Sequence, residues 1–324
     1  MSSIDYVPIP PPPPKSDAAP PKLTAEQEEK YTKVYDHFTK AGYALPGDNN
    51  GEFTDEEKFW LSYECLLRYL RATKWDAQKA TERLESTLKW RREYGVYTHT
   101  PEYIEPEFVT GKQLLFGYDS QNRPALYMFP SRQNTETSDR QIHQVVWTLE
   151  RAADLMGPGT ETLALMIDYG EKGGKSGPPF STSLKVLNIL QDHYPERLGR
   201  AFVINVPFLL NAFYKMINPF IDPVTREKLK FNPNCVKEGH FEPDMLIKEN
   251  WGGERTLEYV HEKFWPALLE LTRERREKHK ERWRELGGEI GVKEWDYKVE
   301  IPDAVEEVKE KGEGVIETTV AVAV

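Results

Sequence analysis

Residues 201–220 constrain the fold more than any other part of the chain. The segment 201–206, AFVINV, is a short run of apolar, β-branched and aromatic side chains, which predicts a strand buried on both faces. Pro207 ends this run, and the apolar side chains that follow recur with the period of a helix. They form one wide stripe: Phe208, Leu209, Ala212, Phe213, Met216, Ile217 and Phe220. A helix with so apolar a surface needs either a cover or a ligand.

Two prolines end this apolar helix, and a basic segment comes next. Pro219 and Pro223 interrupt the helical pattern. Thr225, Lys228 and Lys230 then follow at a predicted new helix start. Free backbone N–H groups at a helix start favour anions, so this segment suits a negatively charged group.

The middle of the chain alternates between predicted strands and predicted helices. We expect strands at residues 113–116, 125–129, 162–169 and 201–206. We expect helices near residues 140–156 and 183–191. Such alternation implies an α/β fold with a largely parallel sheet and helical crossover connections. Capping signals at Thr24 and Thr54 precede helical patterns, so an all-helical domain comes before the sheet.

The same patterns divide the chain into five parts. They are a disordered Pro-rich leader over 1–23, a helical N-terminal domain over 24–102, an α/β domain over 103–255, a C-terminal helical extension over 256–296 and a flexible tail over 297–324. One or two helices are expected within 256–287. The polyproline stretch at 10–14 is compatible with a disordered leader and with an SH3-type ligand, and we favour the former.

The composition excludes several classes of protein. A formal charge of −10 argues against a general nucleic-acid binder, because neutralising phosphates needs clustered lysine and arginine. Cys65 and Cys235 are the two cysteines, so we expect no disulfide framework and a reducing cytosol. The N-terminus has no basic region followed by an apolar one, so it is not a secretory signal. The segment 201–221 approaches the length of a membrane span, but asparagine, lysine and proline interrupt it.

The sequence contains no arrangement of side chains that indicates catalysis or a metal. The segment GGKS at 173–176 follows a predicted strand, but Tyr169 stands where a phosphate-binding P-loop needs glycine. The seven histidines are scattered singly without metal-ligand spacing, and no Gly-x-Ser-x-Gly elbow is present. We therefore expect a binding protein that has no enzyme activity, no metal and no cofactor.

Several motifs resemble one known family. They are LLRYLRATKW at 66–75, KWRREYG at 89–95, YPERLG at 194–199, PFIDPVTREKL at 219–229 and WGG at 251–253. In this order they resemble the CRAL-TRIO lipid-transfer family, and in particular its fungal phosphatidylinositol transfer proteins. The resemblance implies a CRAL-TRIO-like lipid-binding fold over 103–255, with the apolar helix as a gate.

The resemblance also implies a phosphatidylinositol headgroup site. Matched one by one, the headgroup residues of the family fall on Lys74, Glu196, Thr225 and Lys228, and a neighbouring basic position falls on Thr73. The residues alone leave a structural alternative open for each. Lys74 then complements a helix dipole, Glu196 forms a salt bridge at a turn, and Thr225 and Lys228 cap a short helix.

A second set of positions concerns the lipid cavity. Where phosphatidylcholine-exchanging relatives carry polar side chains, this chain has leucine at Leu115, Leu126, Leu163, Leu165 and Leu190. Tyr194 of the YPERLG motif is assigned to the same cavity. Ordinary core leucines are the structural alternative. A zwitterionic phosphocholine group buried there without hydrogen-bond partners would lose several kcal/mol, so an apolar ligand fits better.

The C-terminal part narrows the resemblance further. FWPALLELTRERREK at 264–278 and GGEIGVKEWD at 287–296 resemble the subgroup linked to fungal azole resistance, for which a sterol is the implied second ligand. We expect a non-catalytic protein that transfers or presents phosphatidylinositol and binds a sterol-like lipid. The predicted gate residues are Phe208, Phe213, Met216, Ile217 and Phe220.

The implied partners are lipids and a transient membrane surface, with no nucleic acid. The resemblance implies a cytoplasmic protein that associates peripherally with membranes such as the endoplasmic reticulum or lipid droplets. Protein partners would bind the Pro-rich leader. The alternative function is a regulatory interaction protein that senses lipid occupancy and signals through the leader or the charged C-terminal helix.

Overall fold

A computed structural model of the chain describes residues 4–15, 19–47, 51–170, 180–206 and 226–299. The N-terminal part is helical, as the capping signals predict. Thr24 and Thr54 each accept from the backbone of the third helical residue, and the side chain of that residue binds back to the cap. The helices are α1 (Ala25–Thr39), α2 (Asp55–Trp60), α3 (Tyr63–Ala72) and α4 (Ala77–Tyr94).

These helices enclose a core of their own. Its members are apolar residues that recur with helical spacing, and they include Val34, Phe38, Leu66, Leu70, Leu84 and Leu88. Gly95 ends α4 with φ of 78°, a left-handed conformation that glycine adopts without a steric penalty. The short helices α5 (Pro101–Ile104) and η1 (Glu105–Glu107) then lead into the sheet.

The main sheet has the strand order β2-β3-β4-β5-β6. The pair β2 and β3 is antiparallel and the remaining pairs are parallel, as the alternation of strands and helices predicts. The four predicted strands are confirmed, with slightly different ends. The five strands are β2 (Gln113–Tyr118), β3 (Pro124–Met128), β4 (Leu163–Asp168), β5 (Leu198–Ile204) and β6 (Leu229–Phe231).

The strand β6 corrects one sequence prediction. Lys230 was expected near a helix start, but it lies within β6, and Lys228 lies in the turn before this strand. The sequence LKF is too short to show a strand period by itself. Its backbone pairs with β5, where Ala201 lies opposite Leu229 and Phe202 opposite Lys230. Pairing with a neighbouring strand therefore decides the conformation of this segment.

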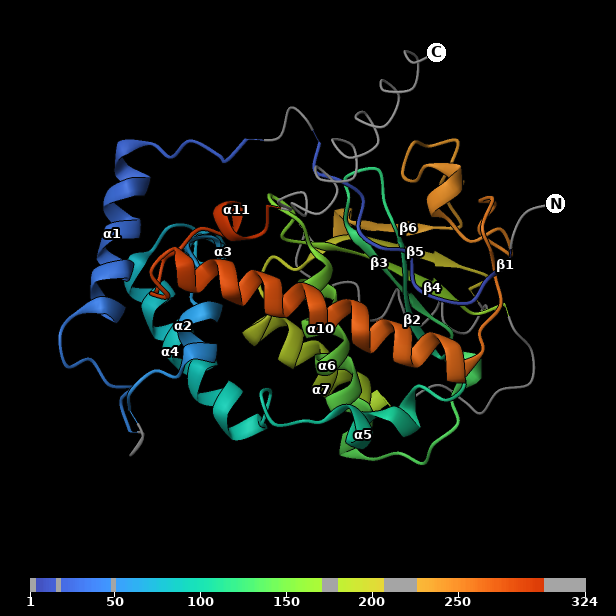
Figure 1. The fold of residues 1–324 in the computed structure, drawn as a ribbon, viewed down its shortest axis with the longest axis horizontal. Coiled ribbons are helices and arrows are strands. Elements are labelled where there is room, and N and C mark those ends of the chain that lie inside the picture. Colours follow the sequence, from blue (N-terminus) through green and yellow to red (C-terminus); the bar gives the residue numbers. More distant parts are fainter. Residues whose placement is uncertain (1–3, 16–18, 48–50, 171–179, 207–225, 300–324) are drawn as a thin grey trace, which may run out of the picture.

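Helices cover one face of the sheet (Figure 1). Thr148 of α6 donates to the side chain of Gln113 on β2, at 3.2 Å, which places α6 on the face that carries Gln113 and Leu115. The long helix α10 packs along α6, and Trp147 and Trp265 lie 5.3 Å apart between them. The elements are α6 (Asp139–Leu155), α7 (Phe180–His193), α10 (His261–Glu285) and α11 (Glu294–Tyr297), with the short turns η2 (Pro130–Arg132) and η4 (Pro243–Met245).

The WGG motif anchors the last part of the α/β domain to the other face of the sheet. The indole of Trp251 packs edge-on against Tyr127 at 5.8 Å. Gly252 has φ of 78°, and a Cβ atom on Gly253 would lie 2.0 Å from the Leu246 carbonyl oxygen. Side chains other than hydrogen are therefore excluded at Gly253, because the backbone of Leu246 occupies the space.

The leader differs from the predicted disordered segment. Residues Ile4–Asp5 form β1, which pairs in parallel with β7 (Thr256–Leu257). Further along, Asn122 donates to the Pro13 carbonyl oxygen at 3.0 Å and Lys15 to that of Ser120 at 2.6 Å. Proline removes backbone donors but keeps its carbonyl acceptor, so side-chain donors of the α/β domain can hold the extended leader.

Candidate functional site

Two predicted headgroup residues occupy strained backbone positions. Lys74, at the end of α3, has φ of 55°, and Glu196, in the turn before β5, has φ of 58°. A left-handed conformation costs a residue other than glycine roughly 1 kcal/mol or more, and such residues concentrate at functional sites. The Thr73 hydroxyl donates to the Tyr69 carbonyl oxygen at 2.9 Å, so in this structure it caps the end of α3.

Arg71 connects these two turns. Its Nη2 atom lies 2.9 Å from Glu161 and its Nε atom 3.5 Å from Oε2 of Glu196. Glu196 keeps 39% of its side chain exposed. The ion pair therefore brings the end of α3 to the start of β5 and leaves the Glu196 carboxylate accessible to a ligand.

Lys228 lies at the same end of the sheet as Glu196. Its carbonyl oxygen accepts from the Ala201 amide at 2.9 Å, directly before β6 begins. Because β5 and β6 are parallel, their N-terminal ends share one edge. Within the described ranges, the Lys74 and Lys228 side chains have no hydrogen-bond or ion-pair partner, so both ammonium groups are available to an anion. Thr225 lies outside the described residues.

The predicted cavity leucines form a row across the sheet. Leu115 lies opposite Leu126, and Leu126 lies opposite Leu165. Directly opposed residues of neighbouring strands point to the same face, and Leu163 shares it because it stands two residues before Leu165. The row continues through Ala201 and Leu229 to the edge strand β6.

The leucines differ in burial. Leu115, Leu126 and Leu163 are at most 4% exposed and belong to the main core, which agrees with the structural alternative for these three. Leu165 on β4 and Leu190 on α7 are half-buried. The predicted gate residues Phe208, Phe213, Met216, Ile217 and Phe220 lie outside the described residues.

Comparison with known proteins identifies this arrangement. Residues 108–253 match the CRAL/TRIO domain, and residues 30–86 match the CRAL/TRIO N-terminal domain. The chain belongs to the CRAL-TRIO family. The resemblance stated from the sequence motifs is thereby confirmed.

Individual relatives agree with this assignment. The CRAL-TRIO chain is 38% identical over 299 residues to the phosphatidylinositol transfer protein PDR17 of Saccharomyces cerevisiae, covering 85% of this chain and 84% of that protein. It is 48% identical over 279 residues to a CRAL-TRIO domain-containing protein of Schizosaccharomyces pombe. That alignment covers 85% of this chain but 27% of the Schizosaccharomyces pombe protein. The present chain thus spans about a quarter of the length of the latter relative.

A solved structure confirms the fold. The crystal structure of Sfh5 superposes with a TM-score of 0.53 at 17% sequence identity, covering 80% of this chain and all of Sfh5. In the described part of this CRAL-TRIO chain, no helix combines the length and the apolar character needed to cross a bilayer.

Tyr194 lines a cavity between the N-terminal helices and the CRAL-TRIO domain. Its hydroxyl donates to Glu150 at 2.7 Å, and Arg91 binds both oxygens of the same carboxylate at 2.9 Å. Burial acts to raise the pKa of Glu150, but the charge and hydrogen bonds of Arg91 outweigh it and lower this pKa to about 2. Leu163 also lines this cavity.

A second buried group of charges faces the same cavity. Nη1 of Arg68 lies 3.2 Å from Glu294 and 3.0 Å from Glu161, and Lys298 binds Glu294 at 2.5 Å. Arg68 is 3% exposed, so its guanidinium is buried together with these carboxylates. Sequence reasoning missed this group because its members lie up to 230 positions apart and share no motif.

Proposed function

We propose that this CRAL-TRIO protein binds phosphatidylinositol and transfers or presents it without catalysing a reaction. The observation that carries the proposal is the pair of Arg71 and Glu196, which leaves the Glu196 carboxylate accessible at the edge of the sheet where Lys228 also lies. The name of PDR17, a phosphatidylinositol transfer protein that this chain matches over most of both lengths, supports the same ligand.

The headgroup would be recognised by charge and by hydrogen bonds. The Glu196 carboxylate would accept hydrogen bonds from inositol hydroxyls, while Lys74 and Lys228 would supply positive charge to the phosphate. Thr225 and Thr73 complete the set predicted from the sequence. Arg71 would act as a positioning residue, because it orients Glu196 and is itself held by Glu161.

The acyl chains would lie against apolar side chains. Removing apolar surface from water contributes about 25 cal/mol per Å², so burial of the chains offsets extraction of the lipid from the bilayer. The half-buried Leu165 and Leu190 are candidate contacts. A sterol-like molecule is the proposed second ligand, because leucines at these positions offer packing and no hydrogen bond to a phosphocholine group.

The proposed place of action is a cytoplasmic membrane surface to which the protein binds transiently. The apolar helix predicted over 208–220 would cover the ligand in solution and meet the bilayer during exchange. This gate is proposed on the sequence pattern. The alternative function is regulatory. In that case lipid occupancy would control the binding of a protein partner to the leader.

A transfer assay tests the proposal. The full chain is mixed with donor vesicles that contain labelled phosphatidylinositol and with unlabelled acceptor vesicles. We expect transfer to rise with protein concentration. Capture of a partner that depends on lipid occupancy, without any transfer, would instead favour the regulatory alternative.

A further inference from the structure

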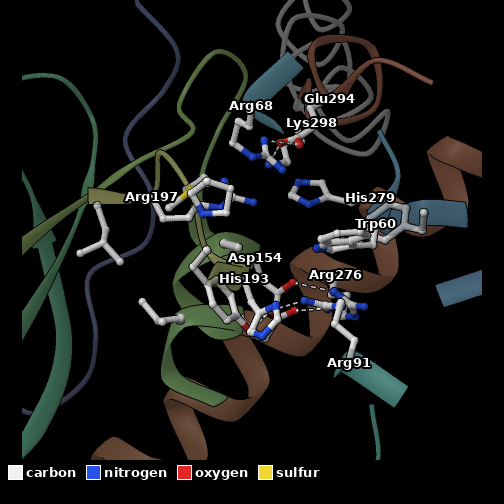
Figure 2. Close-up of a pocket in the computed structure, with 18 of the residues that line it drawn as sticks. Trp60, Arg68, Arg91, Asp154, His193, Arg197, Arg276, His279, Glu294 and Lys298 are labelled. Carbon is white, nitrogen blue, oxygen red and sulfur yellow. Dashed lines mark hydrogen bonds and ion pairs between the residues drawn. The ribbon is translucent and has the colours of Figure 1, made fainter. Parts of the chain in front are cut away.

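A cavity of about 70 Å³, lined by both charged and apolar side chains, lies between the N-terminal helices and the helices α6 and α10. This volume has room for about five water molecules, which is also the number of heavy atoms in a phosphate ion. Figure 2 shows that the side chains around it come from several elements. They include Arg68 and Arg91 from the N-terminal helices, Arg276 and His279 from α10, and Glu294 from α11.

His279 faces this cavity without a partner. Its side chain is 7% exposed, and among the described residues it has no hydrogen bond or ion pair. Its ring lies between the group of Arg68, Glu294 and Lys298 and the group of Arg276 and Arg91 (Figure 2). This imidazole therefore has an unused donor and an unused acceptor that face the cavity.

Arg197 adds a cation that no carboxylate neutralises directly. Its guanidinium donates to the Glu161 carbonyl oxygen at 2.8 Å and contacts the Met156 sulfur at 3.7 Å. Within the described ranges, it has no ion-pair partner. Burial, followed by the positive charge of Arg68, lowers the pKa of Arg197 from its usual value. An anion in the cavity would relieve both effects.

Ion pairs occupy four of the five cationic side chains that line the cavity. Five cationic side chains face three carboxylates, while burial and the charge of Lys298 lower the pKa of His279 to about 2 and keep the imidazole neutral. Each carboxylate already has a cationic partner. Glu150 binds Arg91, Asp154 binds Arg276, and Glu294 binds Arg68 and Lys298. Glu161 also binds Arg68, and Glu56 also binds Arg276, so within the described residues Arg197 is the lining cation that is left without a carboxylate partner.

We propose that this cavity binds a small tetrahedral oxyanion of the phosphate class, with Arg197 and His279 as its donors. The Arg197 guanidinium offers a planar pair of N–H groups to two oxygens, and the neutral imidazole donates one N–H bond. The side chains that line this cavity do not include the proposed headgroup residues Lys74, Glu196 and Lys228. The same chemistry would suit a free anion or the phosphate of a headgroup.

The test measures binding to the full chain. Thermal unfolding is followed in increasing inorganic phosphate, with chloride keeping the ionic strength constant. We expect a saturable rise in Tm for the unchanged protein. His279→Phe keeps the ring volume and Arg197→Gln removes the charge, and each should weaken the apparent phosphate affinity at least tenfold. Arg273→Gln, on the exposed face of α10, is the matched control and should leave the affinity unchanged.

The variants also report on folding. His279→Phe replaces an imidazole that has no hydrogen-bond partner among the described residues by an apolar ring of similar size, so its Tm without phosphate should equal or exceed that of the unchanged protein. A second titration with glycerophosphoinositol distinguishes the source of the anion. A response to this probe alone, abolished by His279→Phe, would assign the site to a headgroup phosphate. The site would be overturned if the unchanged protein responded to neither probe, or if both cavity variants responded as strongly as the unchanged protein, whether or not the protein transfers lipid.

Discussion

The Nε atom of Arg71 lies 3.5 Å from Oε2 of Glu196, which joins the end of α3 to the turn before β5. This pair links the helical N-terminal part to the CRAL-TRIO domain at a left-handed residue. Both partners remain partly exposed, so solvent weakens their attraction. The relationship therefore matters more for the position of the Glu196 carboxylate than for stability.

Loss of a headgroup partner should reduce phosphatidylinositol transfer. Glu196→Ala and Lys228→Ala each leave one charged or polar group of the ligand unpaired, which costs about 1.5–3 kcal/mol, or roughly 10- to 100-fold in affinity. Vesicle transfer assays measure this change. The exposed Glu277→Ala and Lys237→Ala serve as controls. Full transfer by a folded double variant of Glu196 and Lys228 would contradict the assignment.

Arg71→Met tests the positioning role. We expect phosphatidylinositol affinity to fall roughly two- to fivefold, because an accessible ion pair contributes about 0.2–1 kcal/mol. Sterol transfer should stay unchanged, since Glu196 has no part in binding an apolar ring system. Arg71→Lys should restore part of the affinity. An equal loss for both lipids would instead indicate a general structural defect.

The pair of Arg91 and Glu150 should make stability depend on acidity. The pKa of Glu150 is near 4.5 in the unfolded chain and is lowered to about 2 in the folded protein. The contribution of the pair to the free energy of unfolding is therefore fully present above pH 4.5 and is lost as the pH falls through about 2. The contribution is about 3 kcal/mol. Urea unfolding between pH 7 and pH 2 measures it, and Glu150→Gln should flatten this part of the profile. An unchanged profile in that variant would refute the pKa assignment.

The ligand preference should respond to one residue of the leucine row. Leu165→Thr adds a hydroxyl to the half-buried position, so phosphatidylcholine transfer should rise and sterol transfer should fall. Paired assays with labelled phosphatidylcholine and labelled sterol measure both. Met166→Thr is the control, because it puts the same hydroxyl on the opposite face of β4. The assignment fails if the unchanged protein exchanges phosphatidylcholine strongly and takes up no sterol.

Removal of residues 1–15 should destabilise the folded protein. The deletion removes the pairing of β1 with β7, the bond from Tyr6 to Glu258 and the contact of Lys263 over the Tyr6 ring at 3.8 Å. A loss of about 1 kcal/mol corresponds to a Tm decrease of roughly 2–4 °C for a large domain. Calorimetry measures this decrease. A Tm equal to that of the full chain would show that the leader contributes no stability.

The sequence by itself determined the parts of the fold that local patterns encode. Apolar runs marked four strands of the sheet, and the capping residues Thr24 and Thr54 marked helix starts. Both signals act within a few residues, because strand burial and helix capping depend on near neighbours. The motifs around YPERLG and WGG were also sufficient to recognise the family.

Tertiary structure alone decided which charges are buried and where short segments lie. Arg68 can be buried because Glu294, 226 positions later in the chain, neutralises its charge. No local sequence pattern indicates such a partner. The strand β6 and the leader take their conformations from β5 and β7. Ion pairs and strand pairs between distant segments stabilise the fold only after the chain has brought the segments together. The burial of these charges and the conformation of these short segments therefore cannot be predicted from one stretch of sequence.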